Sequence, residues 1–247
     1  MTLLEKGLGK LGLEVDDDKL SLLTRYIDEI ELFNPAYGLV KVKDRDELIV
    51  KHILDSLAPL TVIRNYIFSA GLQGKPERIN IADVGSGAGL QGKPGSLTVA
   101  DIGSGAGLPG IPLAIYLQEF SFSLIERMGR RAGFLRNTIA VLKLCNVKVE
   151  EADVSNFGIV TGDRTQPFNL IVYRAFKPLD NDLLVSLFSL LAPNGIIAAY
   201  KGRKQSIDDE MKCLKAEPRL KFSFDIQPLQ VPFLNEERHV LFLTPVV

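Results

Sequence analysis

A glycine-rich stretch from Val99 to Ile115 most constrains what this chain can fold into. It begins as a short apolar strand, continues as a turn with three glycines, and leads into a helix-forming segment with Pro112 in its first turn. Glycine lets the backbone adopt conformations that other residues resist, and it lets a ligand approach the main chain closely. A helix N-terminus that follows such a turn is a favourable place for a ligand. The stretch therefore predicts a ligand-binding strand, turn and helix.

Two acidic residues narrow the class of ligand. Gly105 to Gly110 fits the dinucleotide fingerprint G-x-G-x-x-G, but that fingerprint should start directly after the strand, which here already ends at Gly103. Asp101 ends the strand, where a carboxylate repels a pyrophosphate and attracts an ammonium group. The resulting D-x-G-x-G-x-G is typical of Rossmann-like S-adenosylmethionine (AdoMet) methyltransferases. Glu126 ends the next apolar run and favours an adenosine-type ligand, since carboxylates there bind ribose in AdoMet and NAD sites alike.

Composition sets the broad class of the protein. With 247 residues, 46% hydrophobic and 24% charged, the chain can bury a full core. No apolar run reaches membrane-spanning length and residues 1–10 lack a signal-peptide core, so we expect a cytoplasmic protein without a membrane partner. Cys145 and Cys213 are predicted to be reduced core residues, and we expect no metal. The net charge of −1 means that any affinity for nucleic acid must come from local basic clusters.

A tandem repeat interrupts the chain before the glycine-rich stretch. Residues 70–90 match residues 88–108 at an offset of 18, with 15 of 21 positions identical. A helix-forming segment follows the second copy, whereas residues 91–96 are rich in turn-forming residues. We therefore assign ligand binding to the second copy. The predicted organisation is a helical extension over 1–69, a surface insertion over 70–96 and an α/β core over 97–247.

Strands and helices alternate from residue 97 onward, which predicts a doubly wound parallel sheet. Ligands in such sheets bind beyond the carboxyl ends of the strands. Before the repeat, one helix is expected to break at residues 34–38 and a second to run from about 47 to 68. The predicted strands are 97–102, 122–126, 147–150, 169–173 and 196–200, with 222–229 and 239–243 as a closing antiparallel pair, and the helices between them are 111–117, 130–142 and 183–191.

Several further motifs carry a resemblance to one known family. They are K-H-I-L-D-S-L at 51–57, the glycine-rich stretch from Asp101 to Pro112, G-R-R at 129–131 with F-L-R at 134–136, R-A-F at 174–176, K-G at 201–202, L-Q-V-P at 229–232 and E-R-H at 237–239. Together and in this order they resemble the bacterial small-subunit ribosomal RNA guanine-N7 methyltransferase family, also called glucose-inhibited division protein B. The resemblance runs from about residue 30 to 245.

The resemblance implies a Rossmann-like methyltransferase fold with a seven-stranded, mostly parallel sheet, a closing antiparallel strand and an N-terminal helical extension. It implies AdoMet as the methyl donor and N7 of a guanine in 16S ribosomal RNA, naked or in the small ribosomal subunit, as the acceptor, in a protein expected to be a monomer. Gly103 and Leu108 would line the AdoMet site, and Arg174 would reach the cofactor or the target base. The expected cofactor-binding residues are Asp101, Gly103, Ser104, Gly105, Gly107, Leu108, Glu126, Val154, Ser155 and Arg174.

This chain departs from the family pattern at three places. The repeat has no family counterpart, and Glu126 stands where an aspartate is usual. Asp153-Val154-Ser155 replaces a more usual Arg-Ala-Glu, so the adenine contact expected there rests on backbone groups. A glutamate at position 126 lengthens the ribose contact but keeps its charge.

The expected chemistry needs no general base. Guanine N7 is a lone-pair nucleophile without a proton, so the protein has to align the reactants and exclude water, and Arg174 is the expected positioning residue. Basic side chains on loops near the predicted cleft favour a phosphate-binding surface. The RNA-binding candidates are Lys51, His52, Arg127, Arg130, Arg131, Lys201 and Arg203, with Arg136 and Lys204 nearby.

Two other classes stay open at this level. An NAD-dependent oxidoreductase would need a catalytic acid and a substrate domain after the sheet, where only a closing strand pair is predicted. A non-catalytic nucleotide- or RNA-binding module would not need Asp101 at the strand end.

Overall fold

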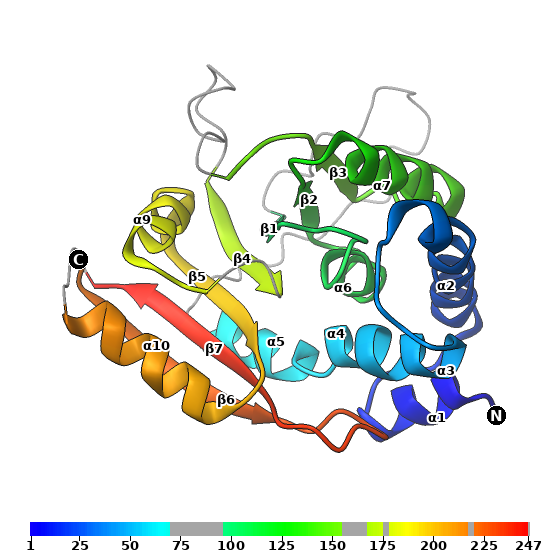
Figure 1. The fold of residues 1–247 in the computed structure, drawn as a ribbon, viewed down its shortest axis with the longest axis horizontal. Helices are drawn as coiled ribbons and strands as arrows, with labels where there is room; N and C mark the ends of the chain where they lie inside the picture. Colours follow the sequence, from blue (N-terminus) through cyan, green and yellow to red (C-terminus); the bar gives the residue numbers. More distant parts are fainter. Residues whose placement is uncertain (70–95, 155–166, 175–177, 217–219, 247) are drawn as a thin grey trace, which may run out of the picture.

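The computed structural model describes residues 1–69, 96–154, 167–174, 178–216 and 220–246, and it contains one seven-stranded sheet (Figure 1). The order across the sheet is β3-β2-β1-β4-β5-β7-β6. The predicted insertion lies outside the described residues except for Ser96. The strands are β1 (Thr98–Ile102), β2 (Ser121–Ile125), β3 (Val147–Glu150), β4 (Phe168–Arg174), β5 (Leu191–Lys201), β6 (Phe222–Leu229) and β7 (Arg238–Pro245).

The direction of the strands confirms the predicted sheet. β1 pairs in parallel with β2 and β4, β3 with β2, and β5 with β4. β7 is antiparallel to both β5 and β6 and closes the sheet at that edge. Because β1 to β5 are parallel, their carboxyl ends meet at one edge, and the strand order reverses between β1 and β4.

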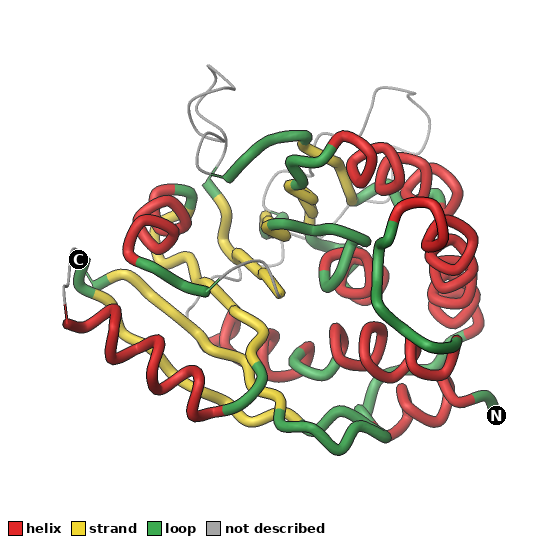
Figure 2. The backbone as a smooth tube through the Cα atoms, viewed as in Figure 1, coloured by secondary structure: helices red, strands yellow, loops and turns green. Residues whose placement is uncertain are grey.

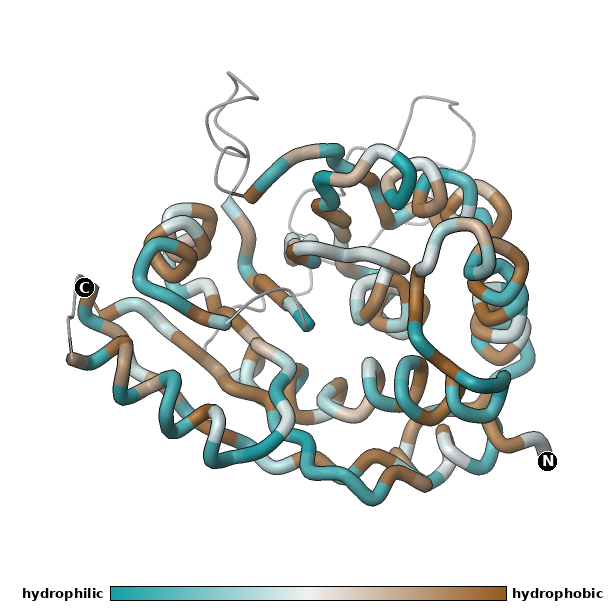
Figure 3. Tube along the Cα trace, in the orientation of Figure 1, coloured by the Kyte–Doolittle hydropathy of each residue, from teal (hydrophilic) through white to brown (hydrophobic). Residues whose placement is uncertain are grey.

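Alternation along the strands gives the sheet two buried faces. In β1, Val99 faces one hydrophobic cluster, whereas Ala100 and Ile102 face another. Strand side chains point to opposite faces with a period of two, so a strand buried on both faces is apolar throughout. The middle of β4 and β5 from Gly195 onward follow this pattern, and both strands contain hydrophobic stretches in Figure 3. The sheet is therefore covered by helices on both sides (Figure 2).

Two groups of helices cover the two faces. α6 (Gly110–Tyr116) and α7 (Gly129–Leu142) pack on the first face with the N-terminal helices, and α9 (Asn181–Ser189) and α10 (Lys204–Ala216) pack on the second. The amphipathic α10, absent from the predicted elements, buries Ile207, Met211 and Leu214. Of the described helices, none has the length and apolar character needed to cross a membrane.

The N-terminal helices share the first hydrophobic cluster with the sheet. They are α1 (Leu3–Lys10), α2 (Asp17–Tyr37), α3 (Arg45–Leu48), the π-helical η1 (Ile49–Leu54), α4 (Asp55–Leu57) and α5 (Leu60–Ser69). The predicted break at 34–38 falls only at its last residue, because α2 continues through Pro35 and ends where Gly38 adopts a φ of 58°. The predicted helix over 47–68 is interrupted at Ala58-Pro59.

Two further expectations are corrected by the structure. Cys145 and Cys213 are exposed, not core residues. The helix predicted over 183–191 spans 181–189, and β5 starts at Leu191, where it pairs with Phe168 before a register shift in β4. Asn194, with a φ of 63°, follows Pro193 inside this first part of β5. The turn-forming residues therefore shape the beginning of the strand instead of separating it from the helix.

Candidate functional site

The glycine loop joins β1 to α6 at the carboxyl edge of the sheet. Gly103, Gly105 and Gly107 all have positive φ, at 67°, 57° and 93°. A Cβ at Gly107 would lie 2.5 Å from Ile111 Cδ1, so a side chain there would strain the backbone and displace Ile111. The Gly107 N–H donates to the Ser104 carbonyl oxygen (2.7 Å), which closes the loop into a tight turn. The predicted strand, turn and helix unit is confirmed as a local structure.

Asp101 is completely buried at the end of β1. Its Oδ2 accepts a hydrogen bond from the Gly110 N–H at the start of α6 (2.9 Å), and its Oδ1 has no partner among the described residues. Burial raises the pKa of Asp101 from 3.8 to about 7. The carboxylate therefore supports the glycine loop from behind, and its predicted attraction for a ligand ammonium stays a prediction.

Glu126 follows β2 and supports the same loop from the other side. Its Oε2 accepts from the Gly105 N–H and its Oε1 from the Met128 N–H, both at 2.9 Å. The side chain is almost fully buried, yet it borders a cleft. The second lone pair on each carboxylate oxygen is left to accept a further hydrogen bond.

A cleft lies directly beyond the carboxyl ends of β1 and β2. Apolar walls and two carboxylates line it, which suits an adenosine: the walls can enclose a purine and an acid can accept from ribose hydroxyls. Val154 lines the cleft, so its expected place beside the adenine stays a prediction, and Ser155 lies outside the described residues. The lining residues are Ile102, Gly103, Ile125, Glu126, Arg127, Met128, Arg131, Ala152, Asp153 and Val154.

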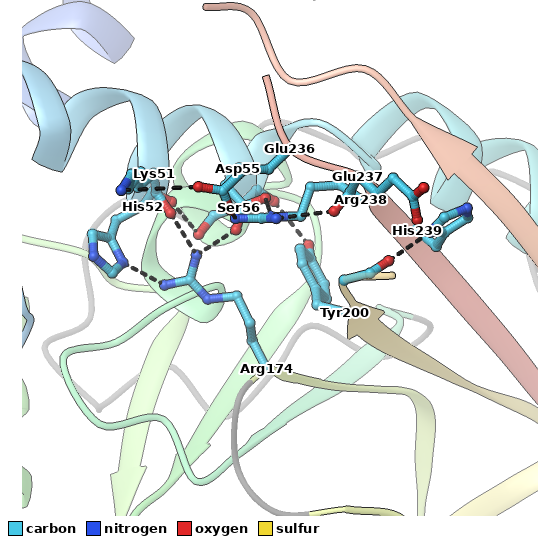
Figure 4. Close-up of polar contacts among 11 residues, drawn as sticks. Lys51, His52, Asp55, Ser56, Arg174, Tyr200, Glu236, Glu237, Arg238 and His239 are labelled. Atoms are coloured by element: carbon cyan, nitrogen blue, oxygen red, sulfur yellow. Dashed lines mark hydrogen bonds and ion pairs between the residues drawn. The ribbon is translucent and has the colours of Figure 1, made fainter. Parts of the chain in front are cut away.

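Arg174 ends β4 and is held by the helix segment that carries the K-H-I-L-D-S-L motif (Figure 4). Its Nη1 donates to Asp55 Oδ2 (2.9 Å) and to the Lys51 carbonyl oxygen (3.4 Å). Its Nη2 lies 2.9 Å from His52 Nδ1. Arg238, in β7, donates from Nε to Asp55 Oδ1 (3.0 Å). Three motifs that lie far apart in the sequence therefore meet at one carboxylate.

His52 is a neutral hydrogen-bonding residue in this cluster. Arginine cannot lose its proton, so Arg174 must donate to Nδ1, and the imidazole proton is assigned to Nε2. Burial, followed by the Arg174 charge, lowers the pKa of His52 from 6.5 to about 4. The ring is therefore uncharged at neutral pH and keeps one N–H donor at Nε2.

The predicted RNA-binding residues fall into separate groups. Arg127 and Arg130 are exposed around the start of α7, and Arg131 lines the cleft with a buried Nε that has no partner in the described part of the chain. Lys51 is half exposed and pairs with Glu47 (2.7 Å). Arg203, before α10, is exposed.

Other basic residues are engaged within the protein. Lys201 Nζ lies 2.7 Å from Glu210 Oε2, and its side chain is only 13% exposed. Arg136 pairs with Glu151 (3.0 Å) and Lys204 with Asp208 (2.9 Å). A paired, mostly buried lysine contributes little to a phosphate-binding surface, so Lys201 is the weakest of the predicted RNA contacts.

Sequence reasoning missed the residues that connect the motifs. Asp55 and Arg238 stand within motifs, at 51–57 and 237–239, that by themselves indicate no role for either residue. Tyr200 in β5 donates from its hydroxyl to the Ser56 carbonyl oxygen (2.8 Å), and Tyr26 in α2 donates to the Ala106 carbonyl oxygen in the glycine loop (2.8 Å). The one available signal was an acidic residue next to Ile53, Leu54 and Leu57 in the motif, since a buried carboxylate needs cationic partners.

A sheet of this order, with a glycine loop after β1 and a buried acid after β2, defines the class of Rossmann-like AdoMet-dependent methyltransferases. Solved structures agree with the fold. An O-methyltransferase from Bacillus cereus in complex with SAH superposes with a TM-score of 0.58 at 15% identity, over 98% of this chain and 97% of that one. The METTL16 methyltransferase domain gives a TM-score of 0.52 at 12% identity, over 87% and 77%.

The chain belongs to the rRNA small subunit methyltransferase G (GidB) family, whose model matches residues 19–98 and again 91–241. The two matches overlap within the repeat. The chain is 37% identical to "Ribosomal RNA small subunit methyltransferase G" of Treponema denticola, over 98% of this chain and 93% of that protein. It is 35% identical to the protein of the same name from Acinetobacter baumannii, over 97% and 95%. Family membership favours the methyltransferase over both alternative classes.

Proposed function

We propose that this protein transfers a methyl group from AdoMet to N7 of a guanine in 16S ribosomal RNA. Family membership over most of the chain carries the proposal, because the relatives are named small-subunit ribosomal RNA methyltransferases. The cleft beyond β1 and β2, with Glu126 at its border, supports the cofactor assignment. We further propose that the protein acts as a cytoplasmic monomer, on naked rRNA or on the small subunit.

The residues at the cleft fit AdoMet. Ile102, Met128 and Val154 offer apolar walls to the adenine, and Glu126 offers acceptors to the ribose hydroxyls. The glycine loop from Gly103 to Leu108 would hold the methionine part close to its backbone, because side chains are absent where the chain turns. When bound, AdoMet supplies an electrophilic methyl group on a sulfonium.

The residues of the chain have to align the reactants, since guanine N7 has no proton to lose. His52 is unsuited to act as a base because its Nδ1 already accepts from Arg174. Arg174 has donors left beyond those that bind Asp55, His52 and Lys51, and these can reach guanine O6, a phosphate or the methionine carboxylate. N7 itself must stay free to attack. Arg174 thus orients the reactants without exchanging a proton with them.

The RNA would approach over the carboxyl edge of the sheet. Arg127 and Arg130 at one side, Lys51 and His52 at the other and Arg203 near β5 offer cationic or donor groups to the backbone. Two of these residues, Lys51 and His52, come from the helices of residues 1–69. We propose that these helices form an extension to the core over 97–247.

The proposal is tested by calorimetric titration with AdoMet, followed by methyl transfer to 30S particles and to naked 16S rRNA. Borohydride reduction and aniline cleavage cut RNA at 7-methylguanosine, so the product can be located. The proposal requires AdoMet binding and a cut at a guanine. A methyl group on an exocyclic nitrogen or a ribose hydroxyl, or transfer to neither substrate, contradicts it.

A further inference from the structure

One buried carboxylate connects three parts of the chain that lie far apart in sequence. Asp55 accepts from Arg174 at Oδ2 and from Arg238 at Oδ1, with distances of 2.9 and 3.0 Å. The Asp55 side chain is 8% exposed and that of Arg174 is 13% exposed, so water screens this ion pair poorly. Both carboxylate oxygens are committed to arginines from different strands, as Figure 4 shows.

These contacts fix the direction of the Arg174 guanidinium. A free arginine side chain samples many rotamers, and about 2 kcal/mol of rotamer entropy is lost when it is ordered. In the folded protein the Arg174 side chain is already ordered before any substrate binds. Asp55, His52 and Lys51 all accept from it and all lie on one short helical segment. His52 and Asp55 are three residues apart and so share a helix face.

The helical segment is itself anchored to the sheet. Ser56 is fully buried, and its carbonyl oxygen accepts from the Tyr200 hydroxyl in β5 (2.8 Å). Its Oγ donates to the His52 carbonyl oxygen (2.6 Å). The segment includes the π-helical turn η1, a feature often found at functional sites. Asp55 therefore rests on a rigid support.

We infer that Asp55 is a positioning residue for methyl transfer, which acts by holding Arg174 in the orientation that the reactants require. Arg238 binds the other oxygen of the same carboxylate. It therefore keeps the Asp55 side chain in place if the Arg174 side chain moves. The inference rests on the proposed function for its catalytic consequence. Its structural part, that Asp55 fixes Arg174 against His52, stands independently.

The first test compares Asp55→Asn with the wild-type protein in methyl transfer to rRNA. Asparagine keeps the size but loses the charge that holds two arginines, so Arg174 should become mobile. A misplacement of about 1 Å can lower a rate by about 100-fold, and we expect kcat to fall by roughly 10- to 100-fold. If Asp55 acts through Arg174, Asp55→Asn added to Arg174→Ala lowers kcat no further. Multiplicative losses overturn the inference.

Stability has to be separated from positioning. Leu187→Ala removes a fully buried side chain in α9, away from the cluster, and serves as a matched destabilised control that should keep kcat near that of the wild type. If Asp55→Asn does not fold, Asp55→Glu keeps the charge but displaces the carboxylate by one methylene. It enters the same cycle with Arg174→Ala, with the same expected lack of additivity.

The second test does not need methyl transfer. The chain has two histidines, so the titration of His52 can be followed by NMR. Loss of the Asp55 charge with Arg174 still in place would leave the pKa of His52 near 4 or below, whereas an Arg174 that moves away lets it rise toward 6.5. Burial of the ring still lowers the pKa in this variant, so we expect the pKa of His52 in Asp55→Asn to rise measurably and to stay below 6.5. An unchanged or lower pKa of His52 overturns the inference. If the wild-type protein does not methylate rRNA, that result overturns only the proposed function.

Discussion

Replacing Asp101 by asparagine should stabilise the ligand-free protein at alkaline pH. Asp101 is completely buried, with Oδ1 unpartnered in the described structure, and burial raises the pKa of its carboxyl from 3.8 to about 7. The folded state thus retains a proton that the unfolded chain loses from about pH 4 upward. Stability from this group is present below pH 4, falls as the pH rises, and is fully lost above about pH 7.

The size of the effect follows from the shift of the pKa. About 3 pH units at 1.36 kcal/mol per unit give a penalty of about 4 kcal/mol for the ionised carboxylate. Asparagine keeps an acceptor for the Gly110 N–H, and its buried NH₂ replaces the unpartnered hydroxyl of the neutral acid. The Asp101→Asn variant should therefore match the wild type only below about pH 4, and at pH 5 it should already be more stable by about 1–2 kcal/mol. At pH 8.5 it should be more stable by about 2–4 kcal/mol, and 3 kcal/mol corresponds to about 6–12 °C in the unfolding midpoint.

Urea unfolding of both proteins without AdoMet, at intervals from pH 5 to pH 8.5, measures the difference directly. Asp16→Asn is the control of opposite sign. The Lys19 hydrogen bond lowers the pKa of Asp16, so this variant should be the less stable one at pH 8, with a difference that shrinks in acid. A difference for Asp101→Asn that does not change with pH, or a loss of stability at pH 8.5, would refute the reasoning.

Three further predictions concern binding and catalysis. Arg174→Ala should raise the activation free energy of methyl transfer by about 2–4 kcal/mol, as for loss of a preorganised donor, and single-turnover methyl transfer measures the resulting fall in rate. A fall of less than threefold would contradict the role of Arg174. At saturating substrates the rate should be nearly flat between about pH 6 and 8.5, and it should decline below about pH 5 as His52, whose pKa is about 4, gains a proton and repels Arg174. A rate profile with a single pKa near 7 would argue against this mechanism. In titrations with AdoMet, Asp101→Ala should abolish binding and Asp83→Ala in the first repeat copy should leave it nearly unchanged, and the reverse result would assign the ligand to the first copy.

The sequence was sufficient to place most of the strands along the chain because the pattern that marks each strand is local. An apolar strand such as β1, a glycine turn and a helix start are each specified by neighbouring residues. The boundaries at Pro35 and Pro193 were less predictable. Pro35 lies in the last turn of α2, which continues to Tyr37 although a proline there removes one helix hydrogen bond. The first part of β5 forms by pairing with Phe168 of another strand.

The glycine loop was predictable for the same local reason, whereas the arginine cluster was not. Arg174 and Asp55 are 119 positions apart, and Arg238 and Asp55 are 183 positions apart. Nothing in the residues near Asp55 says which cations it meets, because that depends on the order of β4, β5 and β7 in the sheet. The same holds for Lys201, whose pairing with Glu210 depends on the return of α10 along the sheet.

The contact between Tyr26 and the glycine loop has a consequence for how this protein can be dissected. Tyr26 is fully buried, and its hydroxyl donates to the Ala106 carbonyl oxygen. Helix α2 therefore holds the glycine loop that would bind the cofactor. A shortened chain that begins at the first strand would lose this clamp and expose the apolar surface beneath it. If AdoMet stabilises the glycine loop, it should also stabilise α2 through this contact. Amide hydrogens in α2 should therefore exchange more slowly once AdoMet is added.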